Sequence, residues 1–329
     1  MTQCAAVPRA PTVSRPVAVV AALVAGGVAV DVLAHHAEVT NALLGVRGAD
    51  RQWLAVAGLA AMALWITGTA TQLGVLHITP PVGRLFAVQV AASFANSLMP
   101  GGVGGMAVNV RFLRRHGLNT GAGMAAVGMN SVAGLVAHLA LLVGVAIAVP
   151  GRFHAVWRTV NGDVHAAMSR HLLVGCAVVA GLLVLATTVA VLRRRAALRA
   201  RGQAVRAELA ALRAVLGHPR RAVALWVGAL AAPLLHCLVL FAVLHSLEVS
   251  VSAMTATAVY LTVSAVAALI PSPGGLGTFD VLLTGALVAV GVYGPAAVGA
   301  VVAYRLATVW LPLVPSGCVF AFLLRRRII

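Results

Sequence analysis

A short proline–glycine motif occurs twice in this chain, each time inside apolar sequence. Pro100-Gly101-Gly102-Val103-Gly104 in the first half is repeated as Pro273-Gly274-Gly275-Leu276-Gly277 in the second. Proline removes a helical hydrogen bond and glycine disfavours the helix, so each copy is expected to break a helix. A helix that resumes after such a break presents free N–H groups and the positive end of its dipole, which suit a phosphate. The sequence therefore predicts substrate-binding residues at Pro100, Gly101, Gly102, Gly104, Pro273, Gly274, Gly275 and Gly277. The alternative is that these glycines serve close helix packing or a hinge.

Three charged residues close to apolar sequence are the other candidates for substrate binding. Asp280 lies inside an apolar segment, where an unpaired charge is costly. It is predicted to bind a cationic headgroup or to carry a coupling proton; the alternative is that it only pairs with Arg305. Arg305 and Arg111 are predicted to grip a phosphate with two hydrogen bonds each. Arg111 also fits a second interpretation, because it belongs to a basic cluster of the kind that flanks membrane spans.

Other polar residues inside the apolar segments have simpler interpretations. His138 and His236 are predicted to be neutral and hydrogen-bonded to a neighbouring helix, with a proton relay as the alternative. Ser93, Asn96 and Ser264 are predicted to bond backbone groups freed by the breaks. The cysteines and histidines show no metal-ligand spacing, and the glycine motifs lack the Lys-Ser/Thr ending of a P-loop. The sequence therefore predicts no catalytic residue, no metal, no cofactor and no enzymatic activity.

The composition indicates a polytopic membrane protein. Of 329 residues, 61% are hydrophobic and only 9% are charged, and the mean hydropathy is +1.00. All 24 basic residues are arginine and the net charge is +17. In a soluble protein this charge would suggest nucleic acid, but here it lies between apolar segments. Membrane topology explains it better, and no nucleic-acid partner is expected.

Six segments are long enough to span a bilayer, and two further segments are broken by the motifs. The predicted spans are 17–37, 53–77, 120–149, 171–192, 222–246 and 296–322, and the predicted re-entrant hairpins are about 86–116 and 254–293. If the N-terminus is cytoplasmic, 18 arginines fall inside and 5 outside. The expected location is therefore the cell membrane, with both termini in the cytoplasm.

These segments divide the chain into two related halves. Each half reads span, span, broken hairpin, span, but the two start on opposite sides, which predicts an all-α fold of two inverted repeats. The expected units are a disordered cytoplasmic tail (1–16), a first membrane repeat (17–150), an external loop (151–170) and a second membrane repeat (171–325). Within the second repeat, 193–221 is predicted to be a basic amphipathic helix on the anionic lipids of the inner leaflet, or a solvated linker.

The motifs resemble those of a known family. The first motif with Arg111, the second with Asp280, and the pattern Arg305-x4-Trp310-x-Pro312-x4-Gly317 are similar to the flippase-like membrane domain of lysylphosphatidylglycerol synthases. The resemblance covers about 17–325 and implies movement of a charged lipid between leaflets. The chain departs from it at Met106 and at Met129-Asn130, where relatives often carry charged residues. It also lacks their soluble aminoacyl-transferase domain, so lysyl-phosphatidylglycerol does not follow as the cargo.

The expected function is that of a lipid flippase for a charged phospholipid or a lipid-linked headgroup. Two alternatives remain: a secondary transporter of a soluble anion, and a non-catalytic membrane subunit of a lipid-modifying or glycan-assembly system. A separate synthase or glycosyltransferase would be a fitting partner. The sequence does not specify the lipid, the coupling ion or the oligomeric state.

Overall fold

The computed structural model describes residues 48–99, 102–167, 217–269 and 277–329, and all regular structure in these ranges is helical. Within these ranges, four helices are long and apolar enough to cross a membrane: α3 (Arg51–Val75), α6 (Thr120–Ala148), α10 (Pro219–Ser246) and the continuous helix Gly294–Arg325. They confirm four of the six predicted spans. The spans predicted at 17–37 and 171–192, the tail 1–16 and most of the linker 193–221 lie outside the described residues.

The last of these helices is continuous but not uniform. It consists of α13 (Gly294–Arg305), one wide π turn η1 (Leu306–Trp310) and α14 (Leu311–Arg325). In the π turn the N–H of Leu311 donates to the carbonyl of Leu306, five residues earlier.

Both motif-bearing segments form pairs of short helices. The first pair is α4 (Val82–Leu98) and α5 (Val103–Arg115), and the second is α11 (Ala253–Ala267) and α12 (Thr278–Ala289). The longest of the four, α4, is about 25 Å long, less than the ~30 Å of a hydrocarbon core. In the first pair the chain turns back on itself, because Gln89 bonds Asn109 at 2.8 Å while Gly104 packs on Ala95.

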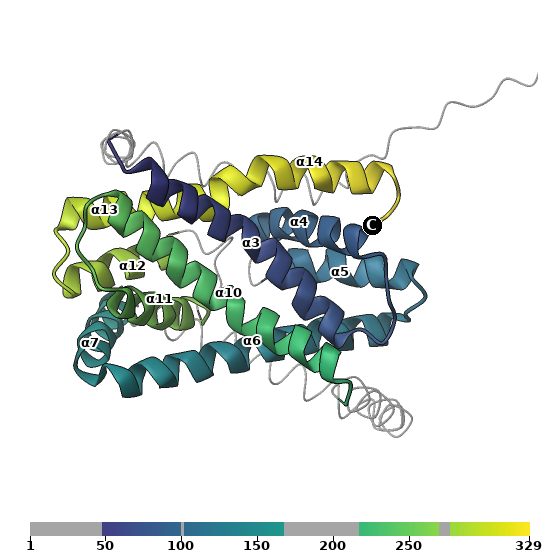
Figure 1. Cartoon of the computed structure of the whole chain (residues 1–329), viewed down its shortest axis with the longest axis horizontal. Coiled ribbons are helices and arrows are strands. Elements are labelled where there is room, and N and C mark those ends of the chain that lie inside the picture. Colours follow the sequence, from purple (N-terminus) through teal and green to yellow (C-terminus); the bar gives the residue numbers. More distant parts are fainter. Residues whose placement is uncertain (1–47, 100–101, 168–216, 270–276) are drawn as a thin grey trace, which may run out of the picture.

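The two hairpins lie at opposite ends of the helix bundle. Figure 1 shows α4 and α5 at the end where the C-terminus lies, and α11 and α12 at the other end. The first hairpin connects the end of α3 to the start of α6, and the second connects the end of α10 to the start of α13. Each hairpin thus enters and leaves the bundle on one side.

Helices α3 and α10 cross the bundle as a closely packed antiparallel pair. At one end the N–H of Asp50 donates to the carbonyl of Ser246 at 2.9 Å, and near the other Gly74 lies against Leu225. A Cβ on Gly74 would lie 2.5 Å from the Leu225 nitrogen, and a Cβ on Gly228 would lie 2.4 Å from Thr71 Oγ1. Two glycines therefore set the distance between the two helices.

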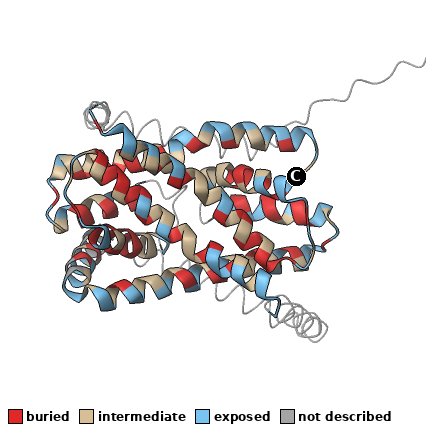
Figure 2. Cartoon of the chain, viewed as in Figure 1, coloured by how far each residue is buried: buried red, intermediate tan, exposed pale blue. Residues whose placement is uncertain are grey.

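Buried apolar residues form two main clusters, one at each end of the bundle. The larger one joins α10, α11, α12 and α13, and its most buried members include Leu244, Leu261 and Leu283. The other joins the first hairpin to α14, where Leu85, Phe112 and Leu323 are buried. Figure 2 shows buried residues facing inward between the helices, with exposed residues along their outer faces.

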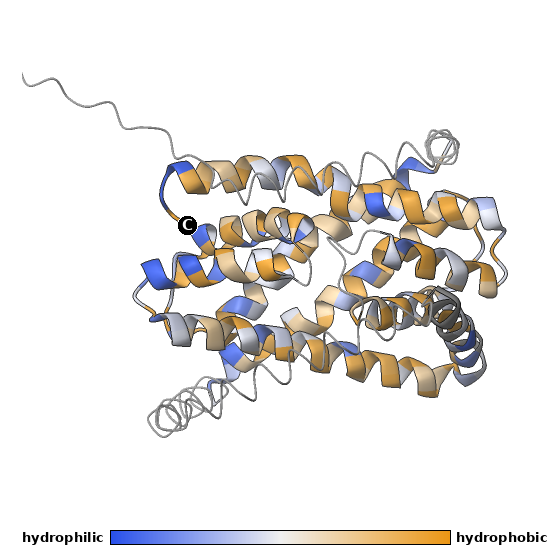
Figure 3. Cartoon of the chain, turned by 180° about the vertical axis from the view of Figure 1, so that it is seen from behind, coloured by the Kyte–Doolittle hydropathy of each residue, from blue (hydrophilic) through white to orange (hydrophobic). Residues whose placement is uncertain are grey.

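The outer faces of the bundle are apolar, as expected for contact with lipid. Figure 3 shows orange, hydrophobic residues along the long helices and strong blue towards the end where the C-terminus lies. Arginines that the sequence analysis placed inside gather at this end, at the start of α4, the end of α5, the start of α10 and the end of α14. They include Arg84, Arg114, Arg115, Arg220, Arg221, Arg325, Arg326 and Arg327.

Residues 151–170, expected to be a loop, are instead largely helical. Helix α7 (Pro150–Ala167) packs against α11 and α12, and Val156 and Val160 are completely buried there. The prediction missed a helical period: Phe153, Val156, Trp157 and Val160 recur at spacings of three and four residues. The connection between the halves therefore covers the second hairpin.

Two of the motif glycines differ in what an added side chain would contact. A Cβ on Gly104 would lie 2.1 Å from the Ala95 carbonyl oxygen, whereas a Cβ on Gly102 meets only Asn96 Oδ1 at 4.0 Å. Gly102 has a φ of +72°, so alanine there is disfavoured by the backbone alone, by about 1–2 kcal/mol. We expect Gly104→Ala to lower the free energy of unfolding by about 3 kcal/mol, and Gly102→Ala by less. Equilibrium unfolding in mixed micelles measures both, and equal losses would contradict this assignment.

Candidate functional site

A polar cavity of about 460 Å³ lies in the middle of the bundle. Its wall comes from the central parts of α3 and α10, from the inner ends of α4 and α5, and from α6, η1 and α14. It includes His236, which lies near the middle of α10, and Thr308 in the π turn. A polar cavity at this depth is unusual in a membrane protein unless it holds water or a polar ligand.

Carboxamide side chains from α4, α5 and α6 line this cavity: Gln89, Asn96, Asn109 and Asn130. Gln89 Nε2 donates to Asn109 Oδ1 at 2.8 Å, and Asn109 Nδ2 donates to the carbonyl of Gly105 at 2.9 Å. Asn130 Nδ2 donates to Gln72 Oε1 at 3.1 Å. These bonds tie α5 to α4 within the first hairpin and tie α6 to α3, and they hold the carboxamides in place.

Asn96 satisfies a backbone group at the hairpin, as the sequence predicted. Its Oδ1 accepts a hydrogen bond of 2.6 Å from the N–H of Gly105, in the first turn of α5. Ser93 and Ser264 do something else: each donates to a carbonyl one turn earlier in its own helix. Ser93 also accepts a bond from the indole N–H of Trp65 at 3.2 Å, which brings α3 and α4 together.

The motif glycines have different environments. Gly102 precedes α5 in a left-handed conformation and lines the cavity, while Gly104 is buried against the backbone of α4. Gly104 therefore fits the packing alternative rather than the predicted binding role. Gly277 precedes α12 with a φ of +80°. The predicted binding residues Pro100, Gly101, Pro273, Gly274 and Gly275 lie outside the described residues.

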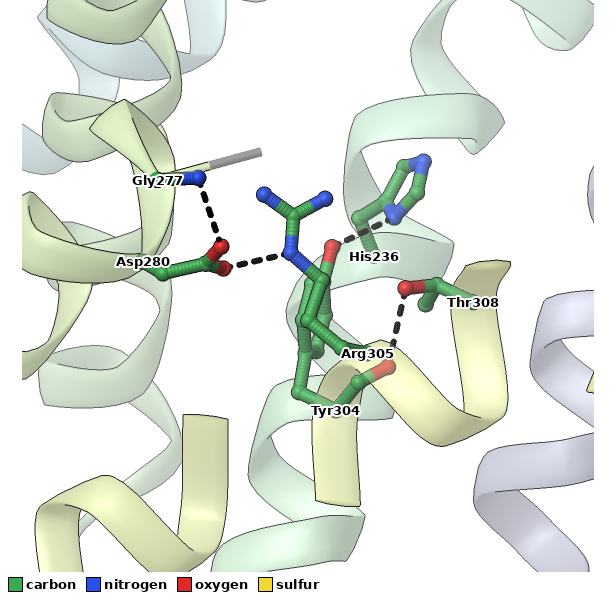
Figure 4. Close-up of polar contacts among 6 residues, drawn as sticks. All are labelled: His236, Gly277, Asp280, Tyr304, Arg305 and Thr308. Carbon is green, nitrogen blue, oxygen red and sulfur yellow. Dashed lines mark hydrogen bonds and ion pairs between the residues drawn. The ribbon is translucent and has the colours of Figure 1, made fainter. Parts of the chain in front are cut away.

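Asp280 and Arg305 form an ion pair between α12 and α13. Arg305 Nε donates to Asp280 Oδ1 at 2.5 Å, and the two side chains are 11% and 27% exposed, respectively. Asp280 Oδ2 accepts a 3.0 Å bond from the N–H of Gly277 and so caps α12 (Figure 4). The guanidinium carbon also lies 4.9 Å from the centre of the Phe279 ring. The pairing that the sequence analysis kept as an alternative is thus what the structure contains.

An aromatic group connects this ion pair to the cavity. His236 Nδ1 bonds the hydroxyl of Tyr304, the neighbour of Arg305, at 2.8 Å (Figure 4). The ring of His236 also stacks on that of Tyr260. His138 Nε2 bonds the carbonyl of Leu261 at 3.0 Å. Both histidines therefore bond neighbouring helices, as predicted.

Arg111 lies apart from this group. It lines a second, mostly apolar pocket of about 280 Å³ between the first hairpin and the C-terminal residues, together with Phe320 and Ile329. The predicted joint grip of Arg111 and Arg305 on one phosphate is not present in this conformation. The positions where the chain departs from the family resemblance, Met106 and Asn130, both line the central cavity.

The sequence analysis missed the carboxamides as a group. Gln72, Gln89, Asn109 and Asn130 lie in four different helices, and nothing in their spacing shows that they form two hydrogen-bonded pairs. The sequence did hold one signal for them, the free-energy cost of placing a polar side chain in lipid. Because of that cost, a polar side chain in a membrane span needs a partner or a ligand. Gln72 is fully buried, and its amide nitrogen makes no hydrogen bond with the described residues.

Comparison with known proteins agrees with the resemblance. The family model described as the lysylphosphatidylglycerol synthase TM region matches residues 17–316. No curated protein matches the chain. Since the family model spans nearly the whole sequence, and the described residues form the apolar helical bundle with two motif-bearing hairpins, the chain is a multi-pass membrane protein that belongs to the family of the lysylphosphatidylglycerol synthase TM region.

Proposed function

We propose that this protein is a lipid flippase, which moves a charged phospholipid or a lipid-linked headgroup between the two leaflets. The observation that carries the proposal is the polar cavity of about 460 Å³ at the centre of membrane-spanning helices. A headgroup that crosses a bilayer needs polar partners at mid-depth, since the hydrocarbon core offers none. The family membership supports a role with membrane lipids.

The two hairpins would act as the halves of an inverted repeat. They enter the bundle from opposite ends, and each second arm begins after a glycine with positive φ. Rocking of one half against the other around a fixed central site is the usual way such architectures expose a site alternately. The headgroup would occupy the cavity while the acyl chains stay in the bilayer. The protein would act without catalysis or a cofactor, driven by an ion gradient, the membrane potential or the lipid gradient.

The arginines indicate how the protein would sit in the cell membrane. Basic residues mark the cytoplasmic side of bacterial-type spans, and here they gather at the end where the C-terminus lies. We therefore orient that end towards the cytoplasm, next to the anionic inner-leaflet lipids. A separate synthase or glycosyltransferase on that side would supply the lipid.

One observation favours a second candidate function. Asp280 and Arg305 already satisfy each other, as expected for a non-catalytic membrane subunit whose charges serve only the fold. In that case cavity variants would leave lipid distribution unchanged.

Filling the cavity tests the proposal. Gly68 lies on the cavity wall in α3, and Gly58 lies in the same helix with no atom near its Cβ position. In vesicles with acyl-labelled lipids, we expect the wild-type protein to speed transbilayer movement. Gly68→Phe should slow it by at least about tenfold, a loss of ~1.4 kcal/mol of transition-state stabilisation. Gly58→Phe is the matched control and should keep the wild-type rate.

Two results would count against the flippase. One is lipid movement that Gly68→Phe leaves unchanged in a correctly folded sample. The other is the absence of movement for every lipid tested, accompanied by uptake of a soluble anion. The second would support the alternative of a secondary anion transporter.

A further inference from the structure

In the part of the chain that the structure describes, the wall of the central cavity has many polar side chains but no charged one. Among the described residues that line it, none is Asp, Glu, Lys or Arg; the polar ones are carboxamides, hydroxyls, the Trp65 indole and the His236 imidazole. Three charged residues that were candidates for substrate binding have other contacts: Asp280 and Arg305 pair with each other, and Arg111 lines the other pocket.

Several wall residues keep unused hydrogen-bonding capacity. Gln89 uses its amide nitrogen on Asn109, Asn96 uses its oxygen on Gly105, and Asn130 uses its nitrogen on Gln72. Within the described ranges, Gln89 Oε1, Asn96 Nδ2 and Asn130 Oδ1 make no further hydrogen bond. A carboxamide can make up to about four. The wall therefore offers donors and acceptors side by side.

This chemistry selects a particular kind of headgroup. A hydroxyl both donates and accepts, so a group with several hydroxyls can pair with mixed donors and acceptors. An ammonium or carboxylate group would lose its hydration on entering the cavity, and no charged side chain among the described wall residues would compensate for that loss. A site built to bond hydroxyls also rejects groups that lack them, since its own polar atoms are then left unpaired.

We infer that the cavity binds a neutral, polyhydroxylated headgroup, such as the sugar of a glycosylated lipid. The inference deepens the proposed function and rests on it, because it names which lipid-linked headgroup the flippase carries. The volume of about 460 Å³ lies within the ~300–1,000 Å³ typical of small-molecule sites. Trp65 and Met106 add apolar surface for the faces of a sugar ring.

The direct test compares lipids that share acyl chains and differ in headgroup. The full chain is reconstituted in phosphatidylcholine vesicles with acyl-labelled monoglucosyl diacylglycerol or acyl-labelled phosphatidylserine. We expect the glucosyl lipid to cross at least about tenfold faster than phosphatidylserine. Phosphatidylserine would make one or two fewer hydrogen bonds with the wall and would bring an unpaired charge into the cavity. A parallel measurement with radiolabelled free glucose shows whether the protein transports a lipid headgroup or a soluble sugar.

Two variants tie the preference to the cavity wall. Asn130→Asp places a carboxylic acid on the wall and removes the donor to Gln72, and Gln89→Met removes a carboxamide while keeping its length. Each should slow the glucosyl lipid by about tenfold. Asn119→Asp is the matched control, because Asn119 is an exposed cap at the start of the same helix α6 and Asp can cap it equally well. It should keep the wild-type rate.

A binding measurement keeps the inference separate from transport. Trp65 lies in the wall, so its fluorescence should change when the glucosyl lipid is added in nanodiscs, and the change should vanish in Trp65→Phe. If no lipid moves but this response is specific for the glucosyl lipid, the flippase proposal fails and the headgroup assignment stands. Uptake of free glucose would also support the headgroup assignment, but it would mean that the cargo is a soluble sugar and not a lipid. Faster movement of phosphatidylserine, with Asn130→Asp and Gln89→Met without effect, would overturn the assignment and leave the flippase intact.

Discussion

Asp280→Asn should destabilise the protein more than any other single change of charge among the described residues. It would leave the Arg305 guanidinium, only 11% exposed, without its carboxylate. Breaking a buried pair in this way costs about 3–5 kcal/mol, and the partial exposure of Asp280 places the expected loss at about 3 kcal/mol. Arg305→Gln should cost less, because Asp280 keeps the N–H of Gly277 and the start of α12 as partners.

The double variant Asp280→Asn/Arg305→Gln gives the sharper result. With neither charge left, we expect its free energy of unfolding to return to within about 1–2 kcal/mol of wild type. Reversible unfolding in mixed micelles measures all three variants. Arg84→Gln, at an exposed position early in α4, is the matched control and should change stability by less than about 0.5 kcal/mol. Additive losses in the double variant would show that the two side chains do not stabilise the fold as a pair.

The same double variant separates folding from transport. If it folds but no longer moves lipid, the pair belongs to the translocation mechanism as well as to the fold. If it folds and moves lipid at the wild-type rate, the ion pair is structural only.

Gly228→Val should be among the most damaging uncharged changes. A Cβ at this position would lie 2.8 Å from the backbone nitrogen of Thr71 and 2.9 Å from the carbonyl oxygen of Thr67, and backbone atoms cannot turn aside as a side chain does. Helices α3 and α10 would have to separate along their contact, at a cost of about 3 kcal/mol. Gly74→Val, which meets the backbone of Leu225, should behave alike.

The control for both is Gly58→Val, since Gly58 also lies in α3 but has open space around its Cβ position. It should change the free energy of unfolding by only a few tenths of a kcal/mol, in the stabilising direction, because valine is a better helix former than glycine. The yield of monodisperse protein and the unfolding midpoint would measure the effects. If Gly228→Val were as stable as Gly58→Val, close approach of α3 and α10 would not hold the bundle together.

The spans and breaks were predictable because they depend on local properties. About 20 apolar residues in a row make a span wherever they occur, and proline with glycine interrupts a helix whatever surrounds it. The boundaries were less accurate. The first arm begins at Val82, directly after two prolines, rather than near 86, and the second hairpin's first arm ends at Ala267, short of 270.

The candidate site was only partly predictable because it is assembled by packing. Asp280 and Arg305 could be singled out individually, as charges in apolar sequence, and their pairing was one of the alternatives. The role of Gly104 could not be told from that of Gly102, since both are glycines of one motif and only the distance to α4 separates them. The carboxamides in the cavity wall need α4, α5 and α6 in register, and no local pattern in the sequence encodes that.

The π turn at Leu306–Trp310 sets the rotational phase of the last helix. Such a turn holds one residue more than an α-helical turn, and one residue corresponds to about 100° of rotation. Before the turn Arg305 faces Asp280, and after it Pro312 and Ser316 face the cavity. A chain with one residue fewer here would twist α14 against α13 by that angle, and it would keep either the ion pair or the cavity wall, but not both.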